Sequence, residues 1–299
     1  MSGRATDEWT GRTGGTTWMQ RVLISMVRRM PLRMLYFMMA FVAAGYAVFN
    51  RPAYRAIYRY FRFRHGNGRI KAWWNALCNH YEFGKIILDR FAMYAGKEYG
   101  FDIEGYEHFA ALDTSEEGFM IYSSHVGNYE VAGYSLVSEH KRYNALVYGG
   151  ESPTVMENRR RMFAGGNINM IVVSDGVSHL YGINNALADG EIVSMPCDRL
   201  FGSQKVVGAT LLGAPVRLPM GPFAVAEQRG VQTLAVFVMK SGLKRYRIHI
   251  IPVEGMDACA GAKRQERMER RAASYAAALD GILRRYPRQW FNYYDFWQQ

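Results

Sequence analysis

The chain has 299 residues, of which 49% are hydrophobic and 21% are charged, so it can bury a large core and global disorder is excluded. Its formal net charge of +11 favours an acidic partner, whether nucleic acid, an anionic bilayer or an acidic protein. The cysteines, Cys78, Cys197 and Cys259, are widely spaced and form no C-x-x-C pair, so neither a disulfide framework nor a zinc site is predicted. Reduced thiols in a cytoplasm-facing protein are the simplest interpretation.

The N-terminal region predicts a membrane anchor. Residues 1–16 are polar and rich in Gly and Thr, and we expect a disordered tail there. The apolar run Met34–Phe49 holds sixteen residues without a charge, and arginines flank it on both sides. A spanning helix needs about 20 such residues, so we interpret 17–65 as anchoring or interfacial helices that lie in the membrane or marginally span it. A cleaved signal peptide is the alternative, although its basic segment would be unusually long.

The end of this region and the start of the next predict amphipathic helices. Arg51–Arg64 interleaves arginines with aromatic residues, which fits an interfacial helix with arginines that reach toward lipid head groups. A helix packed on the catalytic domain would show the same pattern. Arg69–Gly96 then predicts one long amphipathic helix, because its large apolar residues recur at helical spacing.

From Phe119 onward, apolar runs alternate with turns and helical stretches. The strands that we predict are Phe119–Ser123, Ala145–Tyr148, Met170–Val173, Ile192–Pro196, Thr233–Met239 and Arg245–Pro252. The helices that we predict are Tyr129–His140, Thr154–Phe163, Val177–Ala188, Gly221–Arg229 and Gln265–Arg285. Such alternation predicts an α/β fold with a mixed, mostly parallel sheet flanked by helices, formed by a catalytic domain over 66–299.

One polar segment follows the first of these strands and carries candidate chemistry. His125 comes directly after Ser123-Ser124, Gly127-Asn128 allows a tight turn, and Glu130 begins the next helical stretch. Catalytic residues often lie at the carboxyl ends of strands in open α/β sheets. Across such a junction, His125 can act as a general base that Glu130 holds and stabilises. By spacing alone, a histidine that caps a helix start fits equally well.

The wider sequence resembles the late (secondary) acyltransferases of lipid A biosynthesis. Segment 124–130 resembles their H-x4-D/E block, 161–165 their R-x3-G element and 195–199 their P-D-Q stretch. Residues 212–222 resemble their G-x-P…G-P element, and 286–291 their Y-P-x-Q-W ending. The ordered set covers roughly residues 20–297 and is far more specific than any single motif. Two departures stand out, since Arg199 replaces the glutamine of P-D-Q and Asn292–Trp297 replaces the usual basic ending.

The resemblance implies a glycerol-phosphate acyltransferase-like fold and a place at the cytoplasmic face of the bacterial inner membrane. It also implies an acyl thioester co-substrate, usually acyl carrier protein, with no cofactor and no metal. Because acyl carrier proteins are acidic, the net charge of +11 is consistent with that partner, and equally with an anionic lipid or glycolipid acceptor.

The resemblance also suggests roles for individual residues. His125 and Glu130 would be catalytic, and Arg161 would bind an acceptor phosphate or the oxyanion. Asp198 would position Arg161 or the acceptor. A surface charge and a structural salt bridge are the plain alternatives for Arg161 and Asp198. The pair Gly127 and Asn128 would supply backbone donors in the substrate site, or form only a turn.

Other functions fit the residues less well. An acceptor other than a lipid A precursor, such as an amino-lipid or a pigment-like lipid, remains open because the two departures leave the acceptor undetermined. A non-catalytic basic membrane- or nucleic-acid-binding protein lacks a supporting motif, and we expect no nucleic-acid partner. A hydrolase is a further alternative, but the sequence has no G-x-S-x-G elbow.

Cys197 could be considered as a nucleophile, but no histidine lies near it in the sequence. Acyl length and oligomeric state are not determined by the sequence.

Overall fold

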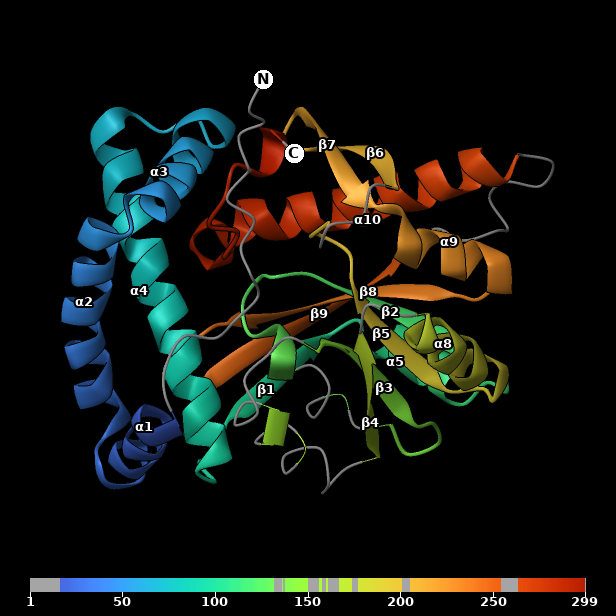
Figure 1. Cartoon of the computed structure of the whole chain (residues 1–299), viewed down its shortest axis with the longest axis horizontal. Coiled ribbons are helices and arrows are strands. Elements are labelled where there is room, and N and C mark those ends of the chain that lie inside the picture. Colours follow the sequence, from blue (N-terminus) through green and yellow to red (C-terminus); the bar gives the residue numbers. More distant parts are fainter. Residues whose placement is uncertain are drawn as a thin grey trace.

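The computed structural model describes residues 17–131, 136, 138–149, 156–157, 160, 167–173, 177–200, 205–253 and 263–298. A seven-stranded sheet lies at its centre, in the order β1-β9-β8-β2-β5-β3-β4 (Figure 1). Its strands are β1 (Gly100–Glu104), β2 (Phe119–Ser123), β3 (Tyr143–Tyr148), β4 (Ile168–Val173), β5 (Ile192–Pro196), β8 (Thr233–Lys240) and β9 (Arg245–Val253). Every neighbouring pair is parallel except β8 and β9. The predicted mixed, mostly parallel sheet is therefore confirmed.

All six predicted strands are present, but three further strands were missed. The edge strand β1 alternates exposed and half-buried residues, so it has no fully apolar run to detect. The other two, β6 (Val206–Leu211) and β7 (Ala214–Pro219), form a separate antiparallel hairpin. Gly208 lies within β6, and Pro215 lies within β7. Glycine and proline normally argue against a strand.

Helices cover both faces of the sheet and create two apolar cores. The alternating side chains of β8 show the division, since Phe237 packs in one cluster and Val238 in the other. One face carries α8 (Ser178–Ala188), α9 (Met220–Arg229) and α10 (Arg264–Arg285). The other carries α4 (Arg69–Tyr94) and α5 (Tyr106–Asp113). All four of the helices α4, α8, α9 and α10 lie where the sequence predicted them.

Two other predicted helices differ in outcome. Of the predicted helix Tyr129–His140, the structure describes 129–131, 136 and 138–140: Tyr129–Val131 forms a 3-10 turn, and 136 and 138–140 are not helical. The Ser138 hydroxyl accepts a hydrogen bond from the backbone N–H of Lys141 at 2.7 Å, which is a local bond that competes with helix formation. The prediction is wrong in these described parts. The predicted helix Thr154–Phe163 falls mostly outside the described residues.

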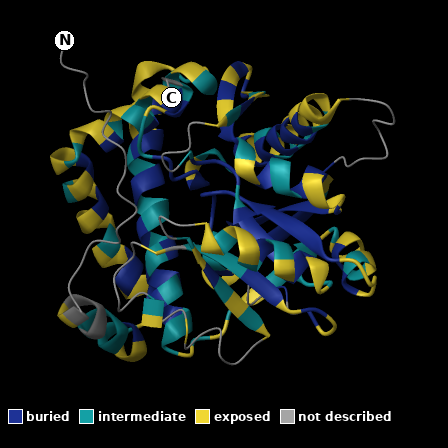
Figure 2. Cartoon of the chain, turned by 45° about the vertical axis from the view of Figure 1, so that its right-hand side comes forward, coloured by how far each residue is buried: buried dark blue, intermediate teal, exposed yellow. Residues whose placement is uncertain are grey.

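The N-terminal region forms helices along the outside of α4. Helix α1 (Thr17–Arg29) is separated by Pro31 from α2 (Leu32–Phe49), because proline at that position starts a new helix rather than continuing the old one. Among the described residues, α2 is the one helix long and apolar enough to cross a membrane. Its outer face is exposed, with Phe41 at 66% and Phe49 at 89% (Figure 2). The tail expected over 1–16 lies outside the described residues.

A third helix links α2 to the domain built around the sheet. Helix α3 (Arg51–Arg59) continues as a π-helical turn, η1 (Tyr60–Arg64). Ile57 and Phe61 have no exposed surface and belong to the main core. One face of this amphipathic stretch therefore packs on the domain, as the alternative interpretation held, while Arg51, Arg55 and Arg59 lie on the exposed side.

Candidate active site

The carboxyl ends of two neighbouring parallel strands bring His125 and Asp198 together. Strands β2 and β5 pair in a register that places Ser123 opposite Pro196. The backbone N–H of Cys197 donates to the Ser123 carbonyl at 2.9 Å, which extends the ladder by one residue. His125 and Asp198 each follow the end of their strand by two residues, so they meet at the same edge of the sheet.

Their contact is a two-point hydrogen bond. The His125 Nδ1 atom lies 2.7 Å from Oδ1 of Asp198, and the backbone N–H of His125 donates to Oδ2 at 2.8 Å. The Asp198 side chain has 0% exposure and that of His125 has 8%. With Nδ1–H donated to the carboxylate, the lone pair of the imidazole lies on Nε2, as a general base requires.

A second layer of contacts holds Asp198 in place. Asn292 donates to Oδ2 of Asp198 at 3.2 Å and accepts from Nε of Arg199 at 2.8 Å. Arg199 also donates to the Phe291 carbonyl at 3.0 Å. The two departures from the resembled pattern, Arg199 and the segment that begins at Asn292, are thus in direct contact. Sequence reasoning noted both departures but missed the contribution of Asn292 to the site.

The last segment of the chain also fixes the backbone around His125. The N–H of Phe291 donates to the His125 carbonyl at 3.1 Å, and Val126 and Trp290 form an antiparallel bridge. The side-chain amide of Gln289 makes two hydrogen bonds with the backbone of Lys240 at the end of β8, both 2.9 Å. The Q-W ending of the resembled pattern therefore holds the backbone of the turn that carries His125.

Glu130 does not occupy the place that the sequence predicted. We expected its carboxylate to hold the imidazole, but among the described residues that contact is made by Asp198. Glu130 instead pairs with Arg90 of α4 at 2.9 Å and accepts from the Tyr94 hydroxyl at 3.4 Å. The 3-10 turn directs Glu130 toward α4 rather than back toward His125.

Arg90 is a site residue that the sequence analysis did not identify. Its Nε donates to Oδ1 of Asn128 at 3.3 Å, and its guanidinium lies 5.2 Å from the ring centroid of Tyr129. Together with its pair to Glu130, these contacts hold three consecutive residues after the catalytic turn. Nothing in a single sequence marks this arginine, since it lies within a long amphipathic helix remote from the motif.

Gly127 and Asn128 form a turn rather than a cradle for an oxyanion. Their backbone N–H groups already donate to the carbonyls of Gln289 and Val238, each at 2.8 Å. Gly127 has φ +53°, and a Cβ atom there would lie 2.1 Å from the Val238 oxygen, so only glycine fits. The substrate-binding role that we expected for this pair is replaced by the plain-turn alternative.

The surroundings keep His125 neutral. Burial lowers the pKa of His125, the positive charge of Arg199 lowers it further, and Asp198 opposes both. Burial opposes ionisation of Asp198, but its hydrogen bonds with His125 and the positive charge of Arg199 outweigh it and lower the pKa of that carboxyl. A neutral imidazole beside an ionised carboxylate is the resting state of a general base.

Two further candidates have different outcomes. Arg161 lies outside the described residues. Cys197 is fully buried, and burial raises the pKa of its thiol well above the usual value, which argues against a thiolate nucleophile. No cluster of metal-ligating side chains occurs in the part of the chain that the structure describes.

A general base at a strand end can deprotonate a hydroxyl for attack on an acyl group. The model of the bacterial lipid A biosynthesis acyltransferase family matches residues 82–297, a span that includes His125, Asp198 and the C-terminal segment. The chain belongs to this family. It is therefore an acyltransferase that acts on lipid, from a family of membrane-associated bacterial proteins.

Comparison with other proteins adds a distant structural likeness. The crystal structure of the 1-acyl-sn-glycerophosphate (LPA) acyltransferase, PlsC, from Thermotoga maritima is 12% identical, with a TM-score of 0.34. The match covers 91% of this chain and 99% of that one. No curated protein sequence matches the chain.

Proposed function

We propose that the protein transfers a fatty acyl chain from an acyl thioester, carried by acyl carrier protein, to a hydroxyl of a lipid A precursor or related glycolipid. The observation that carries this proposal is the buried His125–Asp198 pair, with Nδ1 and Oδ1 2.7 Å apart, within a lipid A acyltransferase family match.

The proposed reaction is direct transfer to the acceptor. Nε2 of His125 takes the proton of the acceptor hydroxyl as its oxygen attacks the thioester carbonyl. Asp198 fixes the tautomer and stabilises the imidazolium that forms. When the tetrahedral intermediate collapses, the C–S bond breaks and the thiolate of the carrier takes up the proton from His125. The products are the new ester and the free thiol.

Two other residues have supporting roles in this proposal. Glu130 acts indirectly: its ion pair with Arg90 orders the turn that carries His125. Arg161 remains our candidate for binding an acceptor phosphate or the oxyanion. The net charge of +11 supports an acidic carrier protein and an anionic acceptor as partners. We place the enzyme at the cytoplasmic face of the bacterial inner membrane, where α2 would anchor it.

The test combines an assay with lipid analysis. Purified protein receives acyl carrier protein loaded with a fatty acid, or the matching acyl-CoA, together with a lipid A precursor, and the products are identified by mass spectrometry. We expect one added acyl ester and faster turnover with the carrier protein. In a deletion strain, the lipid that loses one acyl chain identifies the acceptor. If that lipid is an amino-lipid or another class, the proposed glycolipid acceptor is wrong. Absence of transfer with either donor would refute the proposal.

A further inference from the structure

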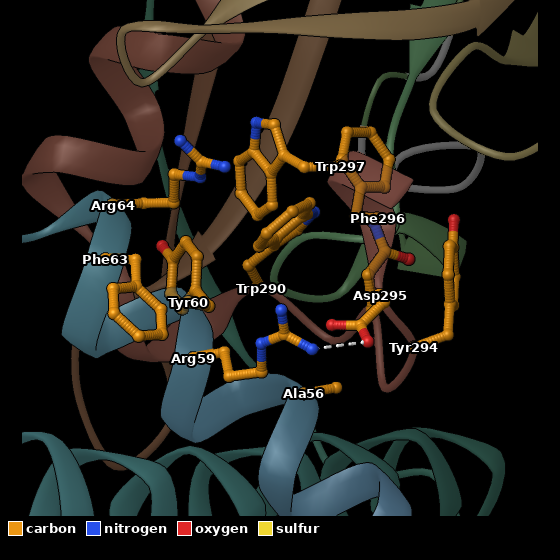
Figure 3. Close-up of a pocket in the computed structure, with 11 residues that line it drawn as sticks. Ala56, Arg59, Tyr60, Phe63, Arg64, Trp290, Tyr294, Asp295, Phe296 and Trp297 are labelled. Atoms are coloured by element: carbon orange, nitrogen blue, oxygen red, sulfur yellow. Dashed lines mark hydrogen bonds and ion pairs between the residues drawn. The ribbon is translucent and has the colours of Figure 1, made fainter. Parts of the chain in front are cut away.

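A pocket separate from His125 lies between α3, η1 and the C-terminal segment. Its volume is about 400 Å³, within the range of about 300–1,000 Å³ that is common for small-ligand sites. Figure 3 shows its wall, where the rings of Tyr60, Trp290 and Trp297 stand close together. Such a wall offers a large apolar contact surface.

The mouth of the pocket carries an excess of positive charge. Arg59 and Arg64 line it, while Asp295 is the single acidic residue among the lining residues. Arg59 pairs with Asp295 at 2.9 Å, and both side chains are almost half exposed, at 46% and 43%. The Arg64 guanidinium lies 4.7 Å from the ring centroid of Trp297, and the described residues provide it with no carboxylate partner. Two guanidinium groups against one carboxylate leave a net charge that suits an anion.

The pocket wall also contains polar groups without a partner. The Tyr60 hydroxyl and Trp290 Nε1 have no hydrogen-bond partner among the described residues. These side chains are 3% and 1% exposed. Buried donors are normally satisfied, and phosphate or ester oxygens are acceptors that could satisfy them. A ligand that combines an apolar part with oxygen atoms would match this wall after a small shift of the rings, because both donor atoms have less than 1 Å² of exposed surface.

The location of the pocket suggests where such a ligand comes from. Phe63 lines the pocket and is 64% exposed. Helix α3 begins directly after α2, whose exposed face ends at Phe49. An exposed apolar face next to a row of arginines is typical of a surface that contacts anionic lipid. The pocket mouth thus lies beside the surface that would face the bilayer.

We infer that this pocket binds a phosphate-bearing membrane lipid, with the phosphate between Arg59 and Arg64 and an acyl chain along the Tyr60, Trp290 and Trp297 wall. Asn292 also lines the pocket and contacts Asp198, so a bound lipid would stabilise the segment that supports the His125–Asp198 pair. The inference does not depend on acyl transfer, because His125 does not line the pocket.

Calorimetric titration of the full-length protein in a neutral detergent tests the inference. The probes are dihexanoyl phosphatidic acid, dihexanoyl phosphatidylcholine with the same chains, and inorganic phosphate. We expect phosphatidic acid to bind more tightly than either of the others. Equal binding of phosphatidylcholine would indicate an apolar site alone, and equal binding of inorganic phosphate an anion site alone. Either result, or no binding at all, overturns the inference.

Two double variants show whether the lipid binds in this pocket. Arg59→Gln with Arg64→Gln should weaken phosphatidic acid about tenfold or more, because each guanidinium loses its charge-assisted bonds. The matched control, Arg51→Gln with Arg55→Gln, removes the same charge from the exposed side of α3 and should change affinity by less than about twofold. If both double variants lose affinity for phosphatidic acid equally, the binding depends only on general surface charge, and the inference is contradicted.

Asp295→Asn should change the affinity for phosphatidic acid in the opposite direction. The carboxylate of Asp295 competes with a bound phosphate for Arg59, so its removal should tighten binding of phosphatidic acid. Thermal unfolding of each variant checks that it is folded. A weaker affinity in a folded Asp295→Asn protein would show that the arginine is not available to the ligand.

Discussion

The chemistry of the site depends on one pair of side chains and on the charges around it. His125 is buried against Asp198, and Arg199 adds a positive charge nearby, connected to that carboxylate through Asn292. Burial and Arg199 together lower the pKa of His125. The same arginine therefore acts in two ways, since it positions Asn292 and it disfavours protonation of the base.

A pH profile tests this electrostatic arrangement. The proposed reaction requires neutral His125, so we expect activity to be lost as the pH falls through the pKa of that residue. Because this pKa is lowered, the acid limb of kcat/KM should lie below about 6.5, the usual value for histidine. Arg199→Gln removes a positive charge and should move the acid limb to higher pH. Arg217→Gln, at an exposed position on β7, should leave it unchanged; an unmoved acid limb in the Arg199 variant would contradict the assignment.

The sequence singled out His125 as the candidate base, but it did not predict that Asp198 is the carboxylate that contacts the imidazole. Both His125 and Asp198 follow apolar runs that were correctly predicted as strands. Which carboxylate reaches the imidazole depends on the order of strands in the sheet, and apolar periodicity does not give that order. The usable signal was that each residue lies two positions beyond the end of its strand. The contributions of Arg90 and Asn292 arise from tertiary packing alone.

At the scale of elements, one buried polar cluster joins the N-terminal helix α2 to α4 and to the central sheet. Asp89 of α4 accepts hydrogen bonds from the hydroxyls of Tyr36 on α2 and of Tyr99 and Tyr246. It also pairs with Lys240 at the end of β8 at 2.6 Å. Tyr246 accepts in turn from Asn128 at 3.3 Å, so the cluster extends from the membrane helix to the catalytic turn.

Removal of the central carboxylate should be costly. The Asp89 and Lys240 side chains are 0% and 6% exposed. Asp89→Asn would leave a buried ammonium group without its counter-charge, and we expect a loss of about 3–5 kcal/mol in the free energy of unfolding. Denaturant unfolding in detergent measures it. Asp102→Asn, which removes an exposed ion pair of β1 with Arg247, should cost less than about 1 kcal/mol. Equal effects of the two changes would show that the cluster is not a structural link.

At the scale of the whole molecule, apolar and basic surfaces gather at one end. Helices α2 and α3 lie along α4, while α8 lies at the opposite end of the molecule (Figures 1 and 2). In the proposed orientation, this end of the molecule would contact the bilayer and bring the candidate active site close to its lipid substrate. The sequence predicted the anchor and its basic flanks; the packing of α3 on the domain required the structure.

Vesicle binding tests this orientation. Phe41 is 66% exposed on α2, and Tyr181 is 69% exposed on α8. Burial of a phenylalanine in lipid contributes about 1.5–3 kcal/mol, so Phe41→Glu should weaken co-sedimentation with anionic vesicles about tenfold or more. Tyr181→Glu should have no effect, because it lies at the far end. A reversed order of effects would require a different membrane-facing surface.

The most direct test of the central claim is the rate of acyl transfer by His125→Gln and Asp198→Asn protein under saturating acyl donor. General base catalysis is worth about 10²–10⁴-fold, and loss of the orienting carboxylate has an effect of similar size. We predict that each variant lowers kcat by that factor, with little change in the KM for the donor and a wild-type unfolding temperature. Full turnover by the His125→Gln protein would contradict the account.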